Sequence, residues 1–157
     1  MPTRTVNVIS HTCTHSSKFS TPIEFLPSNK EQRLLALASE QAVCSGELKK
    51  HGAVFVINGK VLSRGYNKPA AKKRDFSRLT TIHAENSAIT HFIRRMSRMQ
   101  SYSRMGGTLY IVRIGNTGCY KRSKPCCLCT SFLESVPFVK EVVFSEENNT
   151  FYKMSKL

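Results

Sequence analysis

Two short motifs that lie far apart in this 157-residue chain together carry three side chains of the kind that bind zinc. The first motif is His83-Ala84-Glu85, and the second is Pro125-Cys126-Cys127-Leu128-Cys129. His83, Cys126 and Cys129 can bind one ion only if the fold brings the two motifs side by side. The chain must therefore form a compact domain in which this long-range contact is made.

The number of ligands indicates the kind of zinc site. Catalytic zinc usually has three protein ligands and a water in the fourth position, and the bound metal lowers the pKa of that water from about 16 to about 7. Glu85 lies two residues after His83. It is too close to share the ion comfortably, but it can reach a water held there and transfer its protons. The pattern predicts hydrolytic attack on a polarised carbon.

A closed structural zinc site is the alternative, with Cys119, Cys127 or His91 as a fourth ligand. We favour the open site because a closed one leaves Glu85 without a role. Cys127 is also poorly placed to share the ion. If Cys126 and Cys129 occupy one face of a helical turn, Cys127 points about 100° away from Cys126.

Three helices are expected. Ser28 followed by Glu31 is a capping-box sequence, which predicts a helix from about Lys30 to Ser45, ended by Gly46. A second helix is expected to begin near His83, because apolar residues recur after it at helical spacing: Ala88, Ile89, Phe92, Ile93 and Met96. The third is expected over Cys126 to Val136, where Pro125 favours a helix start.

Strands are expected between and after these helices. His51 to Ile57 and Lys60 to Tyr66 have strand composition, and Asn58-Gly59 between them is typical of a type I′ hairpin turn. Gly107 to Ile114 and Lys140 to Phe144 are rich in strand-forming residues.

The two zinc motifs match the signature H-x-E…P-C-x-x-C of zinc deaminases. On these residues the chain resembles the cytidine/deoxycytidylate deaminase superfamily, over about Lys49 to Phe144. The resemblance implies an α/β fold with three αβα layers and a mixed sheet of about five strands. It also implies His83, Cys126 and Cys129 as zinc ligands and Glu85 as the catalytic proton carrier.

The resemblance also suggests substrate contacts. Gly65-Tyr66-Asn67 looks like the strand-end motif of deoxycytidylate and tRNA adenosine deaminases, whose asparagine contacts sugar or base, so we expect Asn67 to bind substrate. Its alternative role is local turn formation. Further substrate-binding candidates are a residue of the first motif and three cations just before the second: Ala84, Lys121, Arg122 and Lys124.

The C-terminal segment departs from one branch of this superfamily. Only Ser145 to Leu157 follow the last clear strand, which is too short for a crossover to a further parallel strand. We therefore expect a turn at 146–149 and an antiparallel strand near Thr150 to Met154. Such an ending resembles the free-cytidine branch, whereas a histidine as first ligand resembles the deoxycytidylate, tRNA-editing and polynucleotide branches.

Charge suggests an anionic partner. The chain has 24 Lys and Arg against 10 Asp and Glu, a net charge of +14, and residues 67–104 contain nine basic residues with only Asp75 and Glu85. A positive field attracts anionic ligands, so this region is expected to face a nucleotide phosphate or a nucleic-acid backbone. The alternative is a solvated surface with no partner.

Composition leads us to expect one soluble domain, because no apolar run reaches the roughly 18 residues of a membrane span and the N-terminal residues lack the apolar region of a secretory signal. We expect a flexible arm over residues 1–27 and a deaminase domain over 28–157. With two of six cysteines in the metal motif, a reducing compartment is favoured over a disulfide framework, and the other four, Cys127 among them, are expected to remain thiols. A cytoplasmic homo-oligomer is the expectation.

These observations predict a zinc-dependent hydrolase that converts the cytosine of a nucleoside or nucleotide to uracil with release of ammonia, as in pyrimidine salvage. A first alternative is a deaminase acting on cytosine or adenine within RNA or DNA. A second is a catalytically silent, zinc-stabilised protein that binds nucleic acid. The intact Glu85 counts against the second.

Overall fold

The computed structural model describes residues 17–70, 81–96 and 105–157. Its main sheet is mixed, with strand order β1-β9-β8-β6-β2-β3 and the short β7 paired to β6. The elements, in chain order, are β1 (Ile23–Phe25), α1 (Asn29–Val43), β2 (Lys50–Ile57), β3 (Lys60–Tyr66), β4 (Lys68–Pro69), β5 (Thr81–Ile82), α2 (Ala84–Met96), β6 (Gly107–Ile114), β7 (Tyr120–Lys121), α3 (Cys127–Ser135), β8 (Val139–Ser145), the 3₁₀ turn η2 (Glu147–Asn149) and β9 (Phe151–Ser155).

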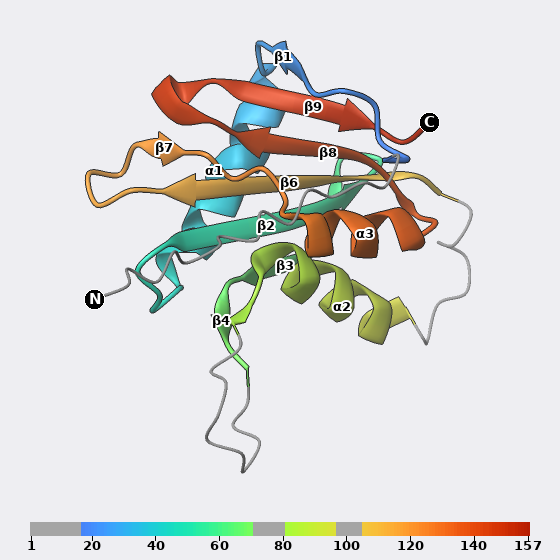
Figure 1. Cartoon of the computed structure of the whole chain (residues 1–157), viewed down its shortest axis with the longest axis horizontal. Coiled ribbons are helices and arrows are strands. Elements are labelled where there is room, and N and C mark those ends of the chain that lie inside the picture. The colour runs from blue at the N-terminus through green and yellow to red at the C-terminus, as the bar shows by residue number, and fades with distance from the viewer. Residues whose placement is uncertain (1–16, 71–80, 97–104) are drawn as a thin grey trace, which may run out of the picture.

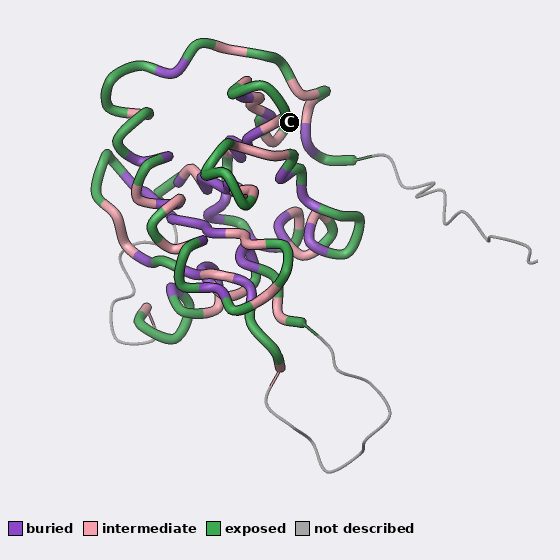
Figure 2. Tube along the Cα trace, turned by 90° about the vertical axis from the view of Figure 1, so that its left-hand side faces the viewer, coloured by how far each residue is buried: buried purple, intermediate pink, exposed green. Residues whose placement is uncertain are grey.

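Helices cover both faces of the sheet, with α1 behind it and α2 and α3 in front in Figure 1. The alternation of side chains along β2 explains the layering. Val54 and Val56 pack with the apolar residues of α1, whereas Phe55 and Ile57 belong to the cluster that contains α2 and α3. Buried positions concentrate in the middle of the molecule, and turns and outer helix faces are exposed (Figure 2). The expected three-layer αβα fold is confirmed.

Local signals produce the expected turns. Asn58 and Gly59 have φ angles of 49° and 74°, the left-handed values that a type I′ turn requires at both central positions. β2 and β3 pair antiparallel around this turn. Ser28 and Glu31 form the expected capping box at the start of α1, which ends slightly earlier than expected, at Val43.

The C-terminal ending is antiparallel, as expected. β8 runs parallel to β6, and β9 then returns antiparallel to β8 after the η2 turn. Asn148 and Asn149 adopt positive φ angles of 60° and 55° in this turn, a conformation that asparagine tolerates better than most residues.

The folded part of the chain begins earlier than the expected boundary at residue 28. β1 pairs antiparallel with β9, and Phe19 forms a bridge to Lys156 with only 4% of its surface exposed. Residues 17–27, which we expected to belong to a flexible arm, thus lie against the sheet edge; residues 1–16 are outside the described part. No helix in the described part is long and apolar enough to span a membrane.

Candidate metal centre and cavity

The two zinc motifs meet at the beginnings of α2 and α3. His83 immediately precedes α2, where its carbonyl accepts a hydrogen bond from Ser87 N at 2.9 Å. Cys126 is the N-cap of α3 and accepts from Thr130 N at 2.8 Å. Cys129 lies in the first turn of α3 and is buried. The long-range contact expected between the two motifs is therefore made at the N-termini of α2 and α3.

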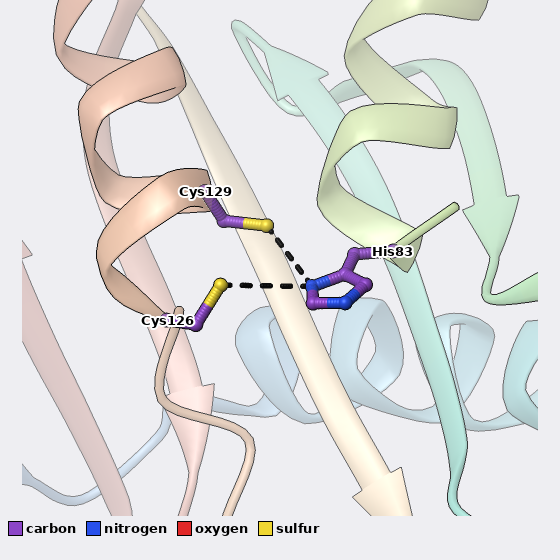
Figure 3. A group of neighbouring side chains, drawn as sticks. All are labelled: His83, Cys126 and Cys129. Atoms are coloured by element: carbon purple, nitrogen blue, oxygen red, sulfur yellow. Dashed lines mark hydrogen bonds between the residues drawn. The ribbon is translucent and has the colours of Figure 1, made fainter. Parts of the chain in front are cut away.

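The three candidate ligand atoms point toward one another (Figure 3). His83 Nδ1 lies 3.2 Å from Cys129 Sγ and 3.7 Å from Cys126 Sγ, and all three atoms fall within 4.8 Å of one another. Zinc bonds of about 2.3 Å to sulfur and about 2.0 Å to nitrogen would place tetrahedral neighbours about 3.5 to 3.8 Å apart. The donor types and their spacing therefore fit zinc. Burial raises the pKa of the Cys129 thiol, so this sulfur needs a nearby cation to become a thiolate ligand.

The candidates for a fourth protein ligand do not join this group. Among the described residues it contains only His83, Cys126 and Cys129. Cys127 is disulfide-bonded in the structure, which corrects our expectation that it remains a thiol. Cys119 is a free, exposed cysteine, and His91 lines a different hollow. The described residues thus form a three-ligand set of the kind found in catalytic zinc sites.

Glu85 lies beside this set and is not part of it. It is in the first turn of α2, has 4% of its surface exposed, and lines the same cavity as His83. Burial raises the pKa of Glu85, against smaller opposing effects of a backbone hydrogen bond and the charge of His83. A buried carboxyl beside the three candidate ligands is placed to accept a proton from a water there and to return it.

Sheet topology brings the other cavity residues to the same place. β6 runs toward the loop that leads to α3, and β2 runs antiparallel to β6, so the first residues of β2 lie beside the end of β6. Gly65 fixes α2 against β3, because a Cβ there would lie 2.4 Å from Ala88 N. The start of α2, the start of β2 and the Cys motif are thereby held together beside the C-terminal end of β6.

The resulting cavity has a volume of about 480 Å³. Its lining combines the metal and proton-carrier candidates with polar side chains from β2, from the chain after β3 and from the loop before α3. Its lining includes His83, Ala84, Glu85, Cys126, His51, Asn67, Lys49, Lys124, Glu47 and Thr81.

Comparison with known proteins agrees with this geometry. Residues 28–146 match the family model described as the cytidine and deoxycytidylate deaminase zinc-binding region. The chain belongs to the cytidine and deoxycytidylate deaminase family. A comparison with curated protein sequences found no match.

Solved structures of deaminases share the fold. The dCMP deaminase from the cyanophage S-TIM5, in apo form, is 22% identical with a TM-score of 0.55, over 80% of this chain and 88% of that one. The cytidine deaminase from Burkholderia pseudomallei is 18% identical with a TM-score of 0.57, over 80% of this chain and 91% of that one. At these identities the likeness establishes the deaminase fold.

Asn67 occupies the wall of the cavity in this deaminase-family chain. Its Oδ1 accepts from His51 N at 2.9 Å, and its Nδ2 donates to the Lys49 carbonyl at 2.6 Å. Each end of the amide keeps one further hydrogen-bonding position. Asn67 therefore ties the end of β3 to the start of β2 and retains the capacity to bind a ligand.

The three loop cations expected near the substrate are placed differently from one another. Lys124 lines the cavity. Lys121 Nζ lies 3.3 Å from Glu147, and Arg122 Nε lies 3.8 Å from Glu146, so both pair with the turn before β9. Neither Lys121 nor Arg122 lines the cavity.

His51 is a cavity residue that the sequence did not single out. Burial, together with the charges of Arg113 and His83, lowers the pKa of His51, so its imidazole is neutral at pH 7. In the sequence it is only the first residue of a strand pattern. The register of β2 against β6, which pairs His51 with Arg113, brings it to the cavity.

Proposed function

We propose that this chain is a zinc-dependent hydrolytic deaminase that converts the cytosine of a monomeric nucleoside or nucleotide to uracil and ammonia. The observation that carries the proposal is the convergence of His83, Cys126 and Cys129 with the buried Glu85 on one cavity. A structural zinc site has no need for a buried carboxyl beside it. A deaminase needs it because protons must move between water, ring and leaving group.

His83, Cys126 and Cys129 would hold the zinc, which when bound supplies a water of lowered pKa at the reacting carbon. The Glu85 carboxylate takes one proton from the attacking water and gives it to N3 of cytosine. It then takes the remaining hydroxyl proton and gives it to the departing amino group. The C4–O bond forms and the C4–N4 bond breaks. Cytosine and water become uracil and ammonia, and Glu85 returns to its initial state.

Cavity size and lining favour a monomeric substrate. A volume of about 480 Å³ lies within the range of small-molecule sites, roughly 300 to 1,000 Å³. Lys124 and Lys49 supply cations for a phosphate, and Asn67 supplies the amide positions that remain for a sugar hydroxyl. One structurally similar protein, the cyanophage S-TIM5 dCMP deaminase, has been solved in complex with dCMP and dUMP.

The test is ammonia release by zinc-loaded protein over cytidine, deoxycytidine, their monophosphates, adenosine, guanine, and single-stranded RNA and DNA. Turnover confined to monomeric cytosine compounds supports the proposal. Turnover only in polymer, or on adenosine or guanine, contradicts it. Stoichiometric zinc with no ammonia from any compound would favour the silent binding protein.

A lysine substitution tests the choice between nucleoside and nucleotide. Lys124→Gln removes a cavity cation without altering the candidate ligands or Glu85. If a phosphate lies there, the variant raises KM for the monophosphate about tenfold and leaves KM for the nucleoside unchanged. Equal effects on both substrates would contradict a phosphate contact.

A further inference from the structure

A second hollow, distinct from the cavity, lies between β3 and α2. Its volume is about 330 Å³. We call it the basic hollow and define it by six of its lining residues: Arg64, Tyr66, Lys68, Asn86, His91 and Arg94. Among the described residues no acidic side chain lines it, although acids elsewhere form ion pairs with Lys121, Arg122 and Lys153.

The arrangement of the basic hollow follows from two periodicities. Arg64 and Tyr66 pair with Val54 and Gly52, so strand alternation puts them on the α1 face of β3, while Gly65 between them lies against α2. Together with Lys68 they therefore line the hollow from the outer edge of β3. Asn86 and Arg94 lie eight residues apart on α2 and therefore share a helix face, with Thr90 between them. Because β3 is an edge strand of the sheet, the hollow opens along that edge.

The small β4–β5 ribbon separates the basic hollow from the cavity. Lys68 pairs with Ile82, and both line the hollow. Their chain neighbours Asn67, Thr81 and His83 line the cavity. Since successive side chains of a strand point to opposite sides, a ligand in the hollow contacts the ribbon on the side away from the metal centre.

The chemistry of the hollow matches a strand of nucleic acid. Arg64 and Lys68 are exposed, and neither takes part in the ion pairs found within the described residues. Lys68 Nζ lies 5.7 Å from the centre of the half-buried Tyr66 ring. An aromatic ring beside exposed cations is the combination by which proteins stack a base and hold its backbone. Asn86 adds hydrogen-bonding groups.

We infer that the basic hollow binds single-stranded nucleic acid, with Arg64 and Lys68 on phosphates and Tyr66 stacked on a base. This inference goes beyond the proposed function and does not depend on it, because the binding residues differ from the candidate catalytic ones. Of the basic region 67–104, residues 71–80 and 97–104 lie outside the described part.

The experiment measures binding of fluorescein-labelled single strands of about 12 nucleotides, RNA and DNA, to the zinc-loaded full chain by anisotropy. Arg64→Glu/Lys68→Glu is expected to raise Kd at least about tenfold. The matched control is Arg33→Glu/Lys140→Glu, which makes the same change in net charge at exposed positions outside the hollow. The control is expected to change Kd by less than about threefold, the effect of a weakened general field.

Salt dependence and stacking sharpen the test. Each phosphate contact to a single strand contributes about 0.7 to the slope of log K against log salt, so the hollow variant should lower that slope by about 1.4. Tyr66→Leu should weaken single-strand binding at least about fivefold through lost stacking. Equal weakening by the hollow and control variants, no measurable binding, or equal affinity for a duplex of the same sequence would each overturn the inference.

Two further measurements keep the result interpretable. If the Glu variants melt below the wild-type chain, Arg64→Ala/Lys68→Ala replaces them, since both positions are exposed. Binding is also measured with Glu85→Gln and with excess dCMP. Oligonucleotide affinity unchanged by either supports a separate surface. Displacement by dCMP would place the strand in the cavity and overturn the inference, whatever the deaminase assay shows.

Discussion

Side chains cap the N-terminus of α1, whereas the side chains at the N-termini of α2 and α3 point toward one another as candidate metal ligands. At α1, Ser28 Oγ accepts from Glu31 N at 3.2 Å while Glu31 Oε2 accepts from Ser28 N at 2.8 Å, so side chains satisfy the free backbone groups. At α3, the N-cap Cys126 makes no side-chain capping bond. Its sulfur points toward His83, the residue before α2.

This difference separates stability from function on the two faces of the sheet. A capped helix start stabilises the fold without any ligand. Helix starts that present metal-binding side chains leave backbone donors near the metal centre, where the positive ends of the helix dipoles favour thiolate and other anions. We therefore expect changes at α1 to affect unfolding alone and changes at α2 and α3 to affect zinc and turnover.

The largest effect is expected for Cys129→Ser. A serine hydroxyl is a poor replacement for thiolate, so the variant should lose stoichiometric zinc on dialysis and all measurable turnover. Zinc is expected to raise the melting temperature of the wild-type chain, because metal binding is coupled to folding, and the variant should lose this rise. Metal content by mass spectrometry and thermal melts with and without chelator measure this. Cys44→Ser, at an exposed free cysteine after α1, is the control; stoichiometric zinc in Cys129→Ser would refute the ligand set.

Glu85→Gln should separate catalysis from metal binding. The amide has nearly the shape of the carboxyl but cannot carry protons, so kcat should fall about 10³-fold. Zinc content should stay stoichiometric, and the melting temperature should not fall, because a buried carboxyl is costly to ionise. Glu47→Gln alters another carboxyl of the same cavity and should change kcat little. Substantial turnover by Glu85→Gln would rule out the proton-carrier role.

Two glycines, one packed against α1 and the other against α2, allow the two faces of the sheet to be compared directly. A Cβ at Gly52 would lie 1.9 Å from Ala38 O of α1, and one at Gly65 would lie 2.4 Å from Ala88 N of α2. Each Gly→Ala substitution should destabilise the chain by about 1 to 3 kcal/mol in denaturant unfolding. Only Gly65→Ala displaces α2, the helix that carries Glu85. The value of kcat per bound zinc ion should therefore fall in Gly65→Ala and remain near wild type in Gly52→Ala. The reverse pattern would contradict the assignment of the catalytic face.

Local signals explain why much of the structure could be predicted from the sequence. Asn58-Gly59 favours a left-handed turn whatever surrounds it, and Ser28 with Glu31 caps a helix through contacts three residues apart. The meeting of His83, Cys126 and Cys129 was also predictable, because a His-Glu spacing and a Cys pair restrict the chemistry together even though their contact is long-range.

What the sequence did not reveal depends on strand register and distant pairing. β1 has only three residues, and its pairing with β9 joins the two ends of the described chain. His51 reaches the cavity because β2 is in register with β6, which no local pattern specifies. Lys121 and Arg122 are paired by acids of the η2 turn, which lies about 25 residues further along the chain.

Tyr110 packs with α1 on one face of the sheet, and its ionisation should make the stability of the fold depend on pH. Burial, with smaller effects from Glu31 and Glu141, raises the pKa of Tyr110 from 10 to about 12. Tyr110 ionises near pH 10 in the unfolded chain and only near pH 12 in the folded chain. The free energy of unfolding therefore falls progressively as the pH rises from 10 to 12. In wild type this loss amounts to about 1.4 kcal/mol at pH 11 and should be absent in Tyr110→Phe. Unfolding in denaturant at pH 9 and pH 11 measures it; identical pH dependence in both chains would contradict the shift.

The smallest effect is expected at the cap of α1. Ser28→Ala removes the hydroxyl that accepts from Glu31 N, and Ser28 is exposed, so no cavity is left in the core. The free energy of unfolding should fall by about 1 kcal/mol, which for a chain of this size lowers the melting temperature by about 2 to 4 °C. Zinc content and kcat should not change, because α1 lies on the far side of the sheet from the metal centre. A loss of turnover in well-folded Ser28→Ala would show that the two faces are coupled and that stability and function are not separated between them.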